Sequence, residues 1–462
     1  MRKRTPLLPL CLLICPLMLR TQEKAANLPD APQIQDQMQK ENPGSGLDTP
    51  ARAMGEPLTR QQAEQLAFKN NPRISVAALL ALSQKQVVRE TRSGLLPALN
   101  GNLTGVDAEE ASRISAGSLT ASRLLYHAGA GLELSQLITD FGHTHNLAAS
   151  SNLQARASEQ NAQATREDIA LAADLAFYNT LEAQATLEVA KSTVKARQAV
   201  VDQVDALTAN NLKSTLDQSF ARVNLSQARL LDLDSQNRFD AAMADFNEVL
   251  GTTSDHNYHL VDDVSLPLPA AASAEAVITL ALQQRPDLLA LKLNHEADVR
   301  FSRAQHELLL PTVSGLGIVG VTPVGSSAYF TPKWYGAAGV NVSVPIFNGF
   351  KFRAEAAEAD LHARASDAQS RVLLDHIVRD VRRAWLTANT AQQRMSVTAA
   401  LEKEANTALD LADTRYRLGL SSIVELSQAQ LQQTQAQIAD ANARFEYEAD
   451  LAALRFQSGS QP

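Results

Sequence analysis

Two long stretches of this chain contain neither glycine nor proline, and they constrain the fold more than any other feature. They cover residues 143–250 and 350–418. Glycine and proline are the strongest helix breakers, so both stretches are predicted to be helical. The leading helix of each stretch, at 142–208 and 350–417, would span roughly 65 residues, or about 100 Å at a rise of 1.5 Å per residue. Helices of that length are unusual in a globular domain and indicate coiled-coil packing.

The composition agrees with long helices packed in a thin layer. Hydrophobic residues make up 45% of the chain, yet aromatic residues make up only 5%. A thick core needs more large side chains, so the apolar surface is predicted to lie along extended seams. Alanine recurs through both helical stretches, for example at Ala170, Ala173, Ala356 and Ala359. Small side chains let helices approach closely and pack side by side into a wall, although the helices alone would also suit an ordinary bundle.

The two halves of the chain are related by an internal duplication. The segment LAFKNNP, which ends at Pro72, matches LALQQRP, which ends at Pro286. LLPALNG and LLPTVSG match in the same way and end at Gly101 and Gly315. Sequence repeats indicate repeated structural units. Each half is therefore predicted to contain a short helix, a strand pair, a long helix and a second helix.

Glycine-rich windows at 94–142 and 315–349 interrupt the helices of each half. Glycine is unfavourable inside helices and common in strands that bend or pack closely. Apolar and polar residues alternate in these windows, as in residues 99–104, which is the pattern of membrane β-strands. Three aromatic residues lie near the strand ends away from the helices, where an interfacial girdle would sit: Tyr126, Trp334 and Tyr335. Four strands cannot close a barrel alone, so the chain is predicted to oligomerise.

The N-terminus is predicted to be an export signal. Basic residues at 2–4 precede an apolar run at 7–19 that is too short to span a bilayer. Both cysteines, Cys11 and Cys15, lie inside this run, so the mature chain would have no thiol. No later stretch approaches the ~20 apolar residues of a membrane helix, so membrane insertion would require a closed β-barrel.

These features divide the chain into five segments. Residues 1–26 are assigned to the signal peptide and 27–56 to a flexible leader rich in Pro, Gln, Gly and Asp. The first structural repeat covers 57–251, with strands at 97–107 and 124–137 and helices at 142–208 and 216–250. A linker covers 252–271. The second repeat covers 272–459, with strands at 311–322 and 334–346 and helices at 350–417 and 422–456.

Several short motifs occur in the same order in both halves. They are the strand entries LLPAL and LLPTV and the strand-to-helix turns ITDFG and PIFNG. A further informative segment, RYRLGLSSIVELSQAQ, lies in the second half at 415–430. With the duplicated element order, they make residues 57–459 resemble the TolC-type outer-membrane efflux proteins.

The resemblance implies an α+β membrane fold. A homotrimer would form a twelve-stranded β-barrel in outer-membrane lipid, with four strands per chain, continued into the periplasm by a long α-helical barrel. The implied function is passive conduction of substrate that an inner-membrane pump delivers through a periplasmic adaptor, or membrane fusion, protein.

The tips of the two predicted hairpins are candidate adaptor-binding sites. Leu418, Gly419 and Leu420 match the family's turn motif, which contacts the adaptor's own hairpin. Gly419 can supply the left-handed conformation that ends a helix, and the leucines would form an exposed apolar knob. Any helical hairpin needs such a turn, so a purely structural role is the alternative. The equivalent tip of the first half lacks the glycine and carries Asn210, Asn211 and Leu212.

Asp217 and Glu425 lie just beyond the tips, at equivalent places in the two halves. In the family, carboxylates here line the closed periplasmic entrance, and threefold symmetry would place them in rings that favour cations. Where the family often has a second acid one turn after Glu425, this chain has Gln428. Tyr416 is a further candidate for gate contacts between helices. The alternative for both acids is that they stabilise helix N-termini through the macrodipole.

No catalytic, cofactor or metal site is predicted. His143 and His145, and the His and Asp residues at 256–263, lie in predicted connections without a second ligand set at fixed spacing. The chain contains no nucleotide-binding loop and no GxSxG motif. Its net charge of -8 argues weakly against nucleic acid as a partner. The rival interpretation is a soluble periplasmic coiled-coil adaptor or scaffold.

Overall fold

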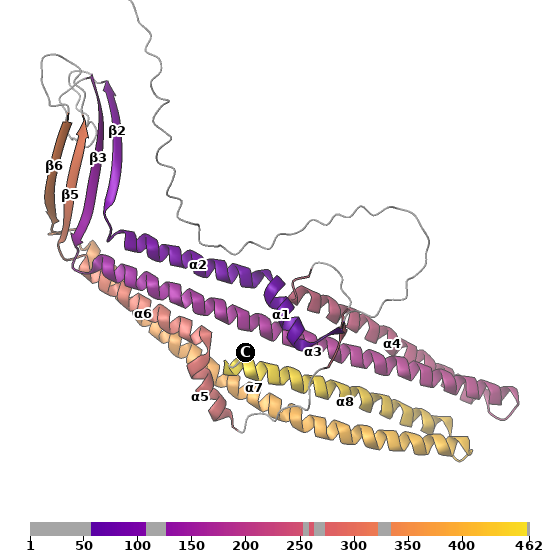
Figure 1. The fold of residues 1–462 in the computed structure, drawn as a ribbon. Coiled ribbons are helices and arrows are strands. Elements are labelled where there is room, and N and C mark those ends of the chain that lie inside the picture. Colours follow the sequence, from indigo (N-terminus) through magenta and orange to yellow (C-terminus); the bar gives the residue numbers. More distant parts are fainter. Residues whose placement is uncertain (1–56, 108–125, 253–257, 263–272, 322–333, 460–462) are drawn as a thin grey trace, which may run out of the picture. The chain divides into compact units, whose positions relative to one another are not determined.

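The computed structural model describes residues 57–107, 126–252, 258–262, 273–321 and 334–459. The predicted signal peptide (1–26) and leader (27–56) lie outside these residues. Two helical hairpins occupy most of the described chain (Figure 1).

Each hairpin consists of one very long helix and one shorter helix. α3 (His143–Ala209) and α7 (Lys351–Arg417) are each 67 residues long. α4 (Thr215–Val249) returns along α3, and α8 (Ile423–Ser458) returns along α7 (Figure 1). The bounds of the long helices differ by at most a residue from those predicted.

The buried face of α7 has coiled-coil spacing. Buried residues recur at multiples of seven positions along the helix: Ala356, Ala363, Ile377, Ala391, Thr398, Ala405 and Ala412. A seven-residue repeat keeps one narrow seam of a helix against its neighbours, and small residues in that seam permit close packing. Among the residues that the structure describes, no helix combines the length and the apolar character needed to span a membrane.

The helices form one layer with a definite order. α3 packs against α2 (Pro72–Ser93) and α4 on one side, and against α6 (Pro286–Glu307) and α8 on the other. α7 in turn packs against α6 and α8. The pair α2 and α4 covers successive parts of α3, and the pair α6 and α8 covers successive parts of α7 (Figure 1). The outermost helices of the layer are therefore α2 and α4 at one edge and α7 at the other.

Each repeat begins with two helices, which are divided just before Pro72 and just before Pro286. α1 (Arg60–Asn70) is separated from α2 by Asn71, and α5 (Ala274–Gln284) is separated from α6 by Arg285. Both separating residues precede a proline and have extended backbones, with ψ of 118° and 121°. The ring of a following proline disfavours the helical conformation, which explains the break.

Four strands form one antiparallel sheet in the order β2-β3-β5-β6. They are β2 (Ala98–Asp107), β3 (Tyr126–Thr139), β5 (Thr312–Val321) and β6 (Trp334–Ser343). Within the described residues, β2 and β6 each pair on one side only. The sheet thus has two open edges, one at β2 and one at β6.

The two faces of the sheet differ in polarity. One face carries large apolar side chains that are 45 to 89% exposed: Leu99, Leu103, Leu132, Leu134, Val319, Val340 and Val342. The other face carries Asn100, Asn102, Glu133 and Asn341, although Leu316 and Ile318 of β5 interrupt its polarity. The predicted alternation is thus present and is least regular in β5. The girdle candidates Tyr126, Trp334 and Tyr335 lie at the strand ends that are distant from the helices.

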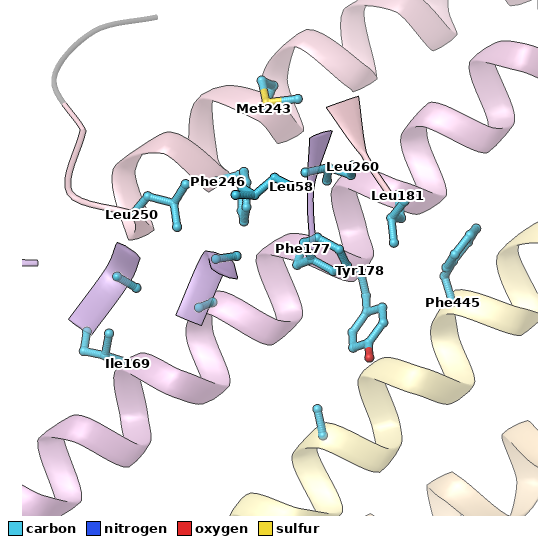
Figure 2. Packing of buried hydrophobic residues seen from close by; sticks show 14 residues of the cluster. Leu58, Ile169, Phe177, Tyr178, Leu181, Met243, Phe246, Leu250, Leu260 and Phe445 are labelled. Atoms are coloured by element: carbon cyan, nitrogen blue, oxygen red, sulfur yellow. The ribbon is translucent and has the colours of Figure 1, made fainter. Parts of the chain in front are cut away.

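Part of the predicted linker at 252–271 is integrated into the fold. β1 (Pro57–Leu58) pairs in parallel with β4 (His259–Leu260). Leu58 and Leu260 are buried in a cluster with Phe177, Phe246 and Leu250 (Figure 2). Two-residue strands are too short to produce a periodic pattern, so the sequence did not reveal this pairing.

A cluster of charged side chains lies partly buried where α1 meets α3. The Arg60 guanidinium donates hydrogen bonds to the carboxylates of Glu64 and Asp174, the latter at 3.1 Å. Asp174 is only 3% exposed. The pKa of Glu64 is raised to about 7, mainly by burial and also by the neighbouring Asp174 carboxylate, while Arg60 and Arg455 oppose the shift. Because the Asp174 carboxylate lies next to Glu64, a second negative charge on Glu64 is disfavoured.

The raised pKa of Glu64 predicts a loss of stability with rising pH. In the unfolded chain the carboxyl loses its proton near its ordinary pKa of 4.5, whereas the folded protein keeps it until about 7. The folded state binds more protons in this window, so the free energy of unfolding falls as pH rises through it. Glu64→Gln should flatten the decline, as measured by thermal unfolding of the detergent-extracted protein between about pH 5 and about pH 8.

The control is Glu90→Gln, which alters an exposed glutamate on α2. It should keep the pH dependence of the parent protein. If Glu64→Gln and the parent lose stability equally over this window, Glu64 is not the group responsible.

Candidate functional site

The tip that follows α3 closes with a Schellman motif. The amide of Asn211 donates to the carbonyl of Thr208 at 3.0 Å, and the amide of Leu212 donates to that of Leu207 at 2.9 Å. These bonds satisfy carbonyls that the end of a helix leaves without partners. Asn211 has a φ of 57°, the left-handed conformation that asparagine tolerates better than most residues. The missing glycine therefore does not change the turn.

The tip that follows α7 has the same two hydrogen bonds. Gly419 donates to Tyr416 at 3.0 Å, and Leu420 donates to Arg415 at 2.8 Å. Gly419 has a φ of 75°, which is the left-handed conformation expected of it. The two tips are equivalent in backbone geometry as well as in sequence position.

Exposed leucines flank both turns. Leu212 is 69% exposed, Leu418 is 68% exposed and Leu420 is 67% exposed. Asn210 is also exposed, and its side-chain amide donates to the carbonyl of Ala206 at 2.8 Å. Each tip thus presents apolar surface to solvent, and contact with an adaptor remains a prediction.

Asp217 stabilises the start of α4. The amide of Ser214 donates to the Asp217 carboxylate at 3.1 Å, and the amide of Asp217 donates to Ser214 Oγ at 3.2 Å. This reciprocal pair is a capping box, which satisfies free amides at the N-terminus of a helix. Asp217 therefore stabilises the N-terminus of α4, which was the alternative to a gate role. This local role is compatible with a further role at an entrance.

Glu425 occupies the equivalent place in α8 but makes a different bond. Its amide donates to Ser422 Oγ at 3.3 Å, while its carboxylate forms an ion pair with Arg415, whose Nε lies 3.0 Å from the carboxylate oxygen. Arg415 belongs to the last turn of α7, so this ion pair joins the two helices of the second hairpin. Gln428 lies one turn further along α8 and is exposed. A gate role of these residues is not tested by this geometry.

Tyr416 is buried, with only 3% of its surface exposed. It packs in a cluster to which all four hairpin helices contribute: Val201, Val204, Ala221, Leu225, Tyr416, Ile423 and Leu426. The ammonium of Lys213, in the first tip, lies 4.1 Å from the centre of the Tyr416 ring. Burial, and to a lesser extent Asp217, raises the pKa of Tyr416, so its hydroxyl stays neutral. Within the described residues that hydroxyl has no hydrogen-bond partner.

Further polar contacts hold the hairpins together. The side-chain amide of Asn224 on α4 donates to Ser427 Oγ on α8 at 2.6 Å. Arg197 of α3 is only 7% exposed, and it donates to the backbone carbonyl of Gln430 on α8 at 2.8 Å. Burial lowers the pKa of Arg197 to about 10. The two tips are thus the end of one packed unit rather than two independent hairpins.

Sequence reasoning missed Lys213 and Arg197. Each contacts a partner about two hundred positions away in the chain, so no local spacing signals the contact. Arginine is also seldom buried without an acidic partner, which makes a surface position the default expectation.

The candidate metal ligands lie only partly within the described residues. His143 Nδ1 forms a hydrogen bond with the backbone carbonyl of Ala304 at 2.8 Å. Asp262 pairs with Arg444, whereas His256 and Asp263 lie outside the described residues. Within the described part of the chain, no group of three or more His, Cys, Asp or Glu side chains is placed to hold a metal ion.

The chain is similar in sequence to known outer-membrane proteins. Residues 277–460 match the family described as outer membrane efflux protein. The chain is 24% identical over 382 residues to outer membrane protein OprJ of Pseudomonas aeruginosa, covering 79% of this chain and 76% of OprJ. It is 22% identical over 413 residues to outer membrane protein TolC of Escherichia coli, covering 84% of this chain and 79% of TolC.

Solved structures share the fold. CusC superposes with a TM-score of 0.76 at 18% sequence identity, covering 87% of this chain and 92% of that chain. The outer-membrane channel OprN superposes with a TM-score of 0.74 at 19% sequence identity, covering 87% of this chain and 90% of OprN. The Campylobacter jejuni CmeC outer membrane channel superposes with a TM-score of 0.75 at 18% sequence identity, covering 87% of this chain and 85% of CmeC.

The matched domain occupies the second structural repeat, and the homology to OprJ and TolC extends over more than three quarters of the chain. The repeated helices, the four-stranded sheet and the fold shared with outer-membrane channels agree with this homology. Residues 277–460 therefore carry an outer membrane efflux protein domain, and the chain as a whole is homologous to the outer-membrane proteins OprJ and TolC.

Proposed function

We propose that this protein is the outer-membrane channel of an efflux or secretion system. It conducts substrate passively across the outer membrane and periplasm, after an inner-membrane pump and a periplasmic adaptor have delivered it. The relatives named above are outer-membrane proteins and channels, so a transport role is proposed rather than an enzymatic one.

The observation that carries the proposal is a sheet with two open edges and one apolar face. β2 and β6 leave backbone N–H and C=O groups without partners on their outer sides, within the described residues. In lipid such groups must be satisfied, which only a closed barrel achieves for strands. Pairing β6 of one copy with β2 of the next closes the sheet, and three copies of the four-stranded sheet give twelve strands.

The helical layer is open at the corresponding edges. Its α4 edge exposes apolar side chains at seven-residue spacing, Leu216, Val223 and Leu230, which are 53 to 64% exposed. Its α7 edge exposes another apolar row: Leu361, Val372, Leu386 and Val397. α2 leads into β2, and β6 leads into α7. One cyclic arrangement of three copies can therefore close the sheet and cover both helical edges.

The hairpin tips are proposed to form the periplasmic entrance. Their exposed leucines offer an apolar surface to the hairpin of an adaptor. Repetition by threefold symmetry would bring Asp217 and Glu425 into rings at this end, with Gln428 and Tyr416 near them. The packed contacts between the tips favour a closed resting entrance.

Mass and conductance test the channel directly. Light scattering of the detergent-extracted protein should give the mass of three chains, and planar bilayers should show conductance. Replacing both acids, as Asp217→Asn with Glu425→Gln, should change the conductance because it removes charge from the entrance and weakens the Arg415 contact. A soluble, detergent-independent monomer that never conducts would favour the adaptor or scaffold interpretation instead.

The Lys213–Tyr416 contact predicts a second effect on the entrance. Lys213→Met keeps most of the side-chain length but removes the cation over the ring. A cation–π contact stabilises by at least about 0.5–1 kcal/mol, and by more where the ring is buried, so its loss should raise the open-to-closed ratio by roughly twofold to fivefold or more. Single-channel recording measures that ratio.

Lys213→Arg is the matched control, because arginine can retain the cation–π contact. Its open-to-closed ratio should stay near that of the parent protein. Equal ratios in Lys213→Met and the parent would mean that the contact does not restrain the tips.

A further inference from the structure

Glu133 is unusual among the strand residues. It lies in the middle of β3, and the other Asp, Glu, Lys, Arg or His residues of the four-stranded sheet, Asp107 and His127, lie at the end distant from the helices. β5 and β6 contain no Asp, Glu, Lys or Arg. One carboxylate per chain therefore stands in the central part of the sheet.

The strand register places Glu133 on the polar face. It is paired with Asn100 on β2 and with Ile318 on β5. Its neighbours along the strand, Leu132 and Leu134, point to the opposite face and are 47% and 45% exposed. Successive residues of a strand alternate between faces, so the carboxylate and the apolar surface lie on opposite sides of the sheet.

Closure of the barrel decides which side meets water. A membrane barrel turns its apolar face to lipid and its polar face to the lumen, because a charge facing lipid is destabilising. Among the described residues Glu133 has no ion-pair partner. Its charge is therefore compensated by lumen water and mobile ions rather than by a fixed cation within the described sheet.

The internal duplication supplies a natural comparison. Asn341 on β6 is paired with Ser314 on β5, just as Glu133 on β3 is paired with Asn100 on β2. Asn100 and Ser314 are equivalent in the repeated segments LLPALNG and LLPTVSG. The second repeat thus has a neutral amide where the first has a carboxylate.

We propose that Glu133 is a charge-selectivity residue in the lumen of the barrel, and that it makes the outer-membrane part of the duct favour cationic over anionic substrates. This inference rests on the proposed channel function. Threefold symmetry places three Glu133 carboxylates at one level of the lumen, separate from the entrance acids Asp217 and Glu425. Fixed charges that line a pore concentrate counter-ions and repel co-ions.

Ion selectivity in planar bilayers tests the proposal. Reversal potentials under a KCl gradient give the ratio of potassium to chloride permeability. Glu133→Gln should lower this ratio by roughly twofold or more near 0.1 M salt, where the screening length is about 10 Å. The effect should shrink near 1 M salt, where that length is about 3 Å. Asn341→Asp adds a carboxylate at the repeat-equivalent position and should raise the ratio.

The design separates the barrel from the entrance. Both variants are measured in the parent and in the Asp217→Asn, Glu425→Gln background, so that selectivity at the tips does not mask the lumen. Light scattering confirms that each variant keeps the parent mass. A conducting trimer whose permeability ratio is the same with Glu133→Gln would overturn this proposal alone. A protein that never conducts would remove the channel function and this proposal with it.

Discussion

Close helix–helix contact along α3 is the constraint on which the rest of the structure depends. α3 packs against α1, α2, α4, α6 and α8, so it connects the two repeats and both hairpins. Many of its buried residues are alanines: Ala148, Ala155, Ala157, Ala170, Ala173 and Ala190. Small side chains allow backbones to approach, and dispersion contacts then accumulate along a long seam instead of around a thick core. This explains how a chain with 5% aromatic residues can hold a layer of helices together.

The large side chains are concentrated where that layer is interrupted. Breaks before Pro72 and Pro286 let α1 and α5 diverge from the helices that follow them, and the gap between α2 and α4 along α3 falls in the same region (Figure 1). Phe177, Tyr178 and Phe246 pack there with Ala63 and Ala67 of α1, and the rings of Phe177 and Phe246 are 6.1 Å apart (Figure 2). Arg60, Glu64 and Asp174 border this cluster, so the raised pKa of Glu64 makes the stability of this region depend on pH.

Elements with long, local patterns could be predicted from the sequence, and elements formed by distant partners could not. The long helices and the four strands follow from missing glycine and proline and from apolar alternation, and their observed bounds lie within three residues of those predicted. The β1–β4 pair was missed because two residues carry no period. Lys213 and Tyr416 meet only because two hairpins pack together, and nothing in either local segment signals it. For Asp217 the sequence left open a helix-stabilising role and a role in the periplasmic gate. The capping box accounts for the first, and the second stays a prediction.

The local bonds of the acids bear on how charge acts along the proposed duct. Glu425 is paired with Arg415, and Asp217 accepts the amide and hydroxyl of Ser214. A paired carboxylate produces a weaker field at a distance than a free one, because the cation cancels most of its charge beyond a few ångströms. Counting acids therefore overstates the field at the tips, whereas Glu133 has no ion-pair partner among the described residues. A passing anion would meet resistance in the barrel as well as at the entrance, and the barrel contribution would persist when the tips move apart.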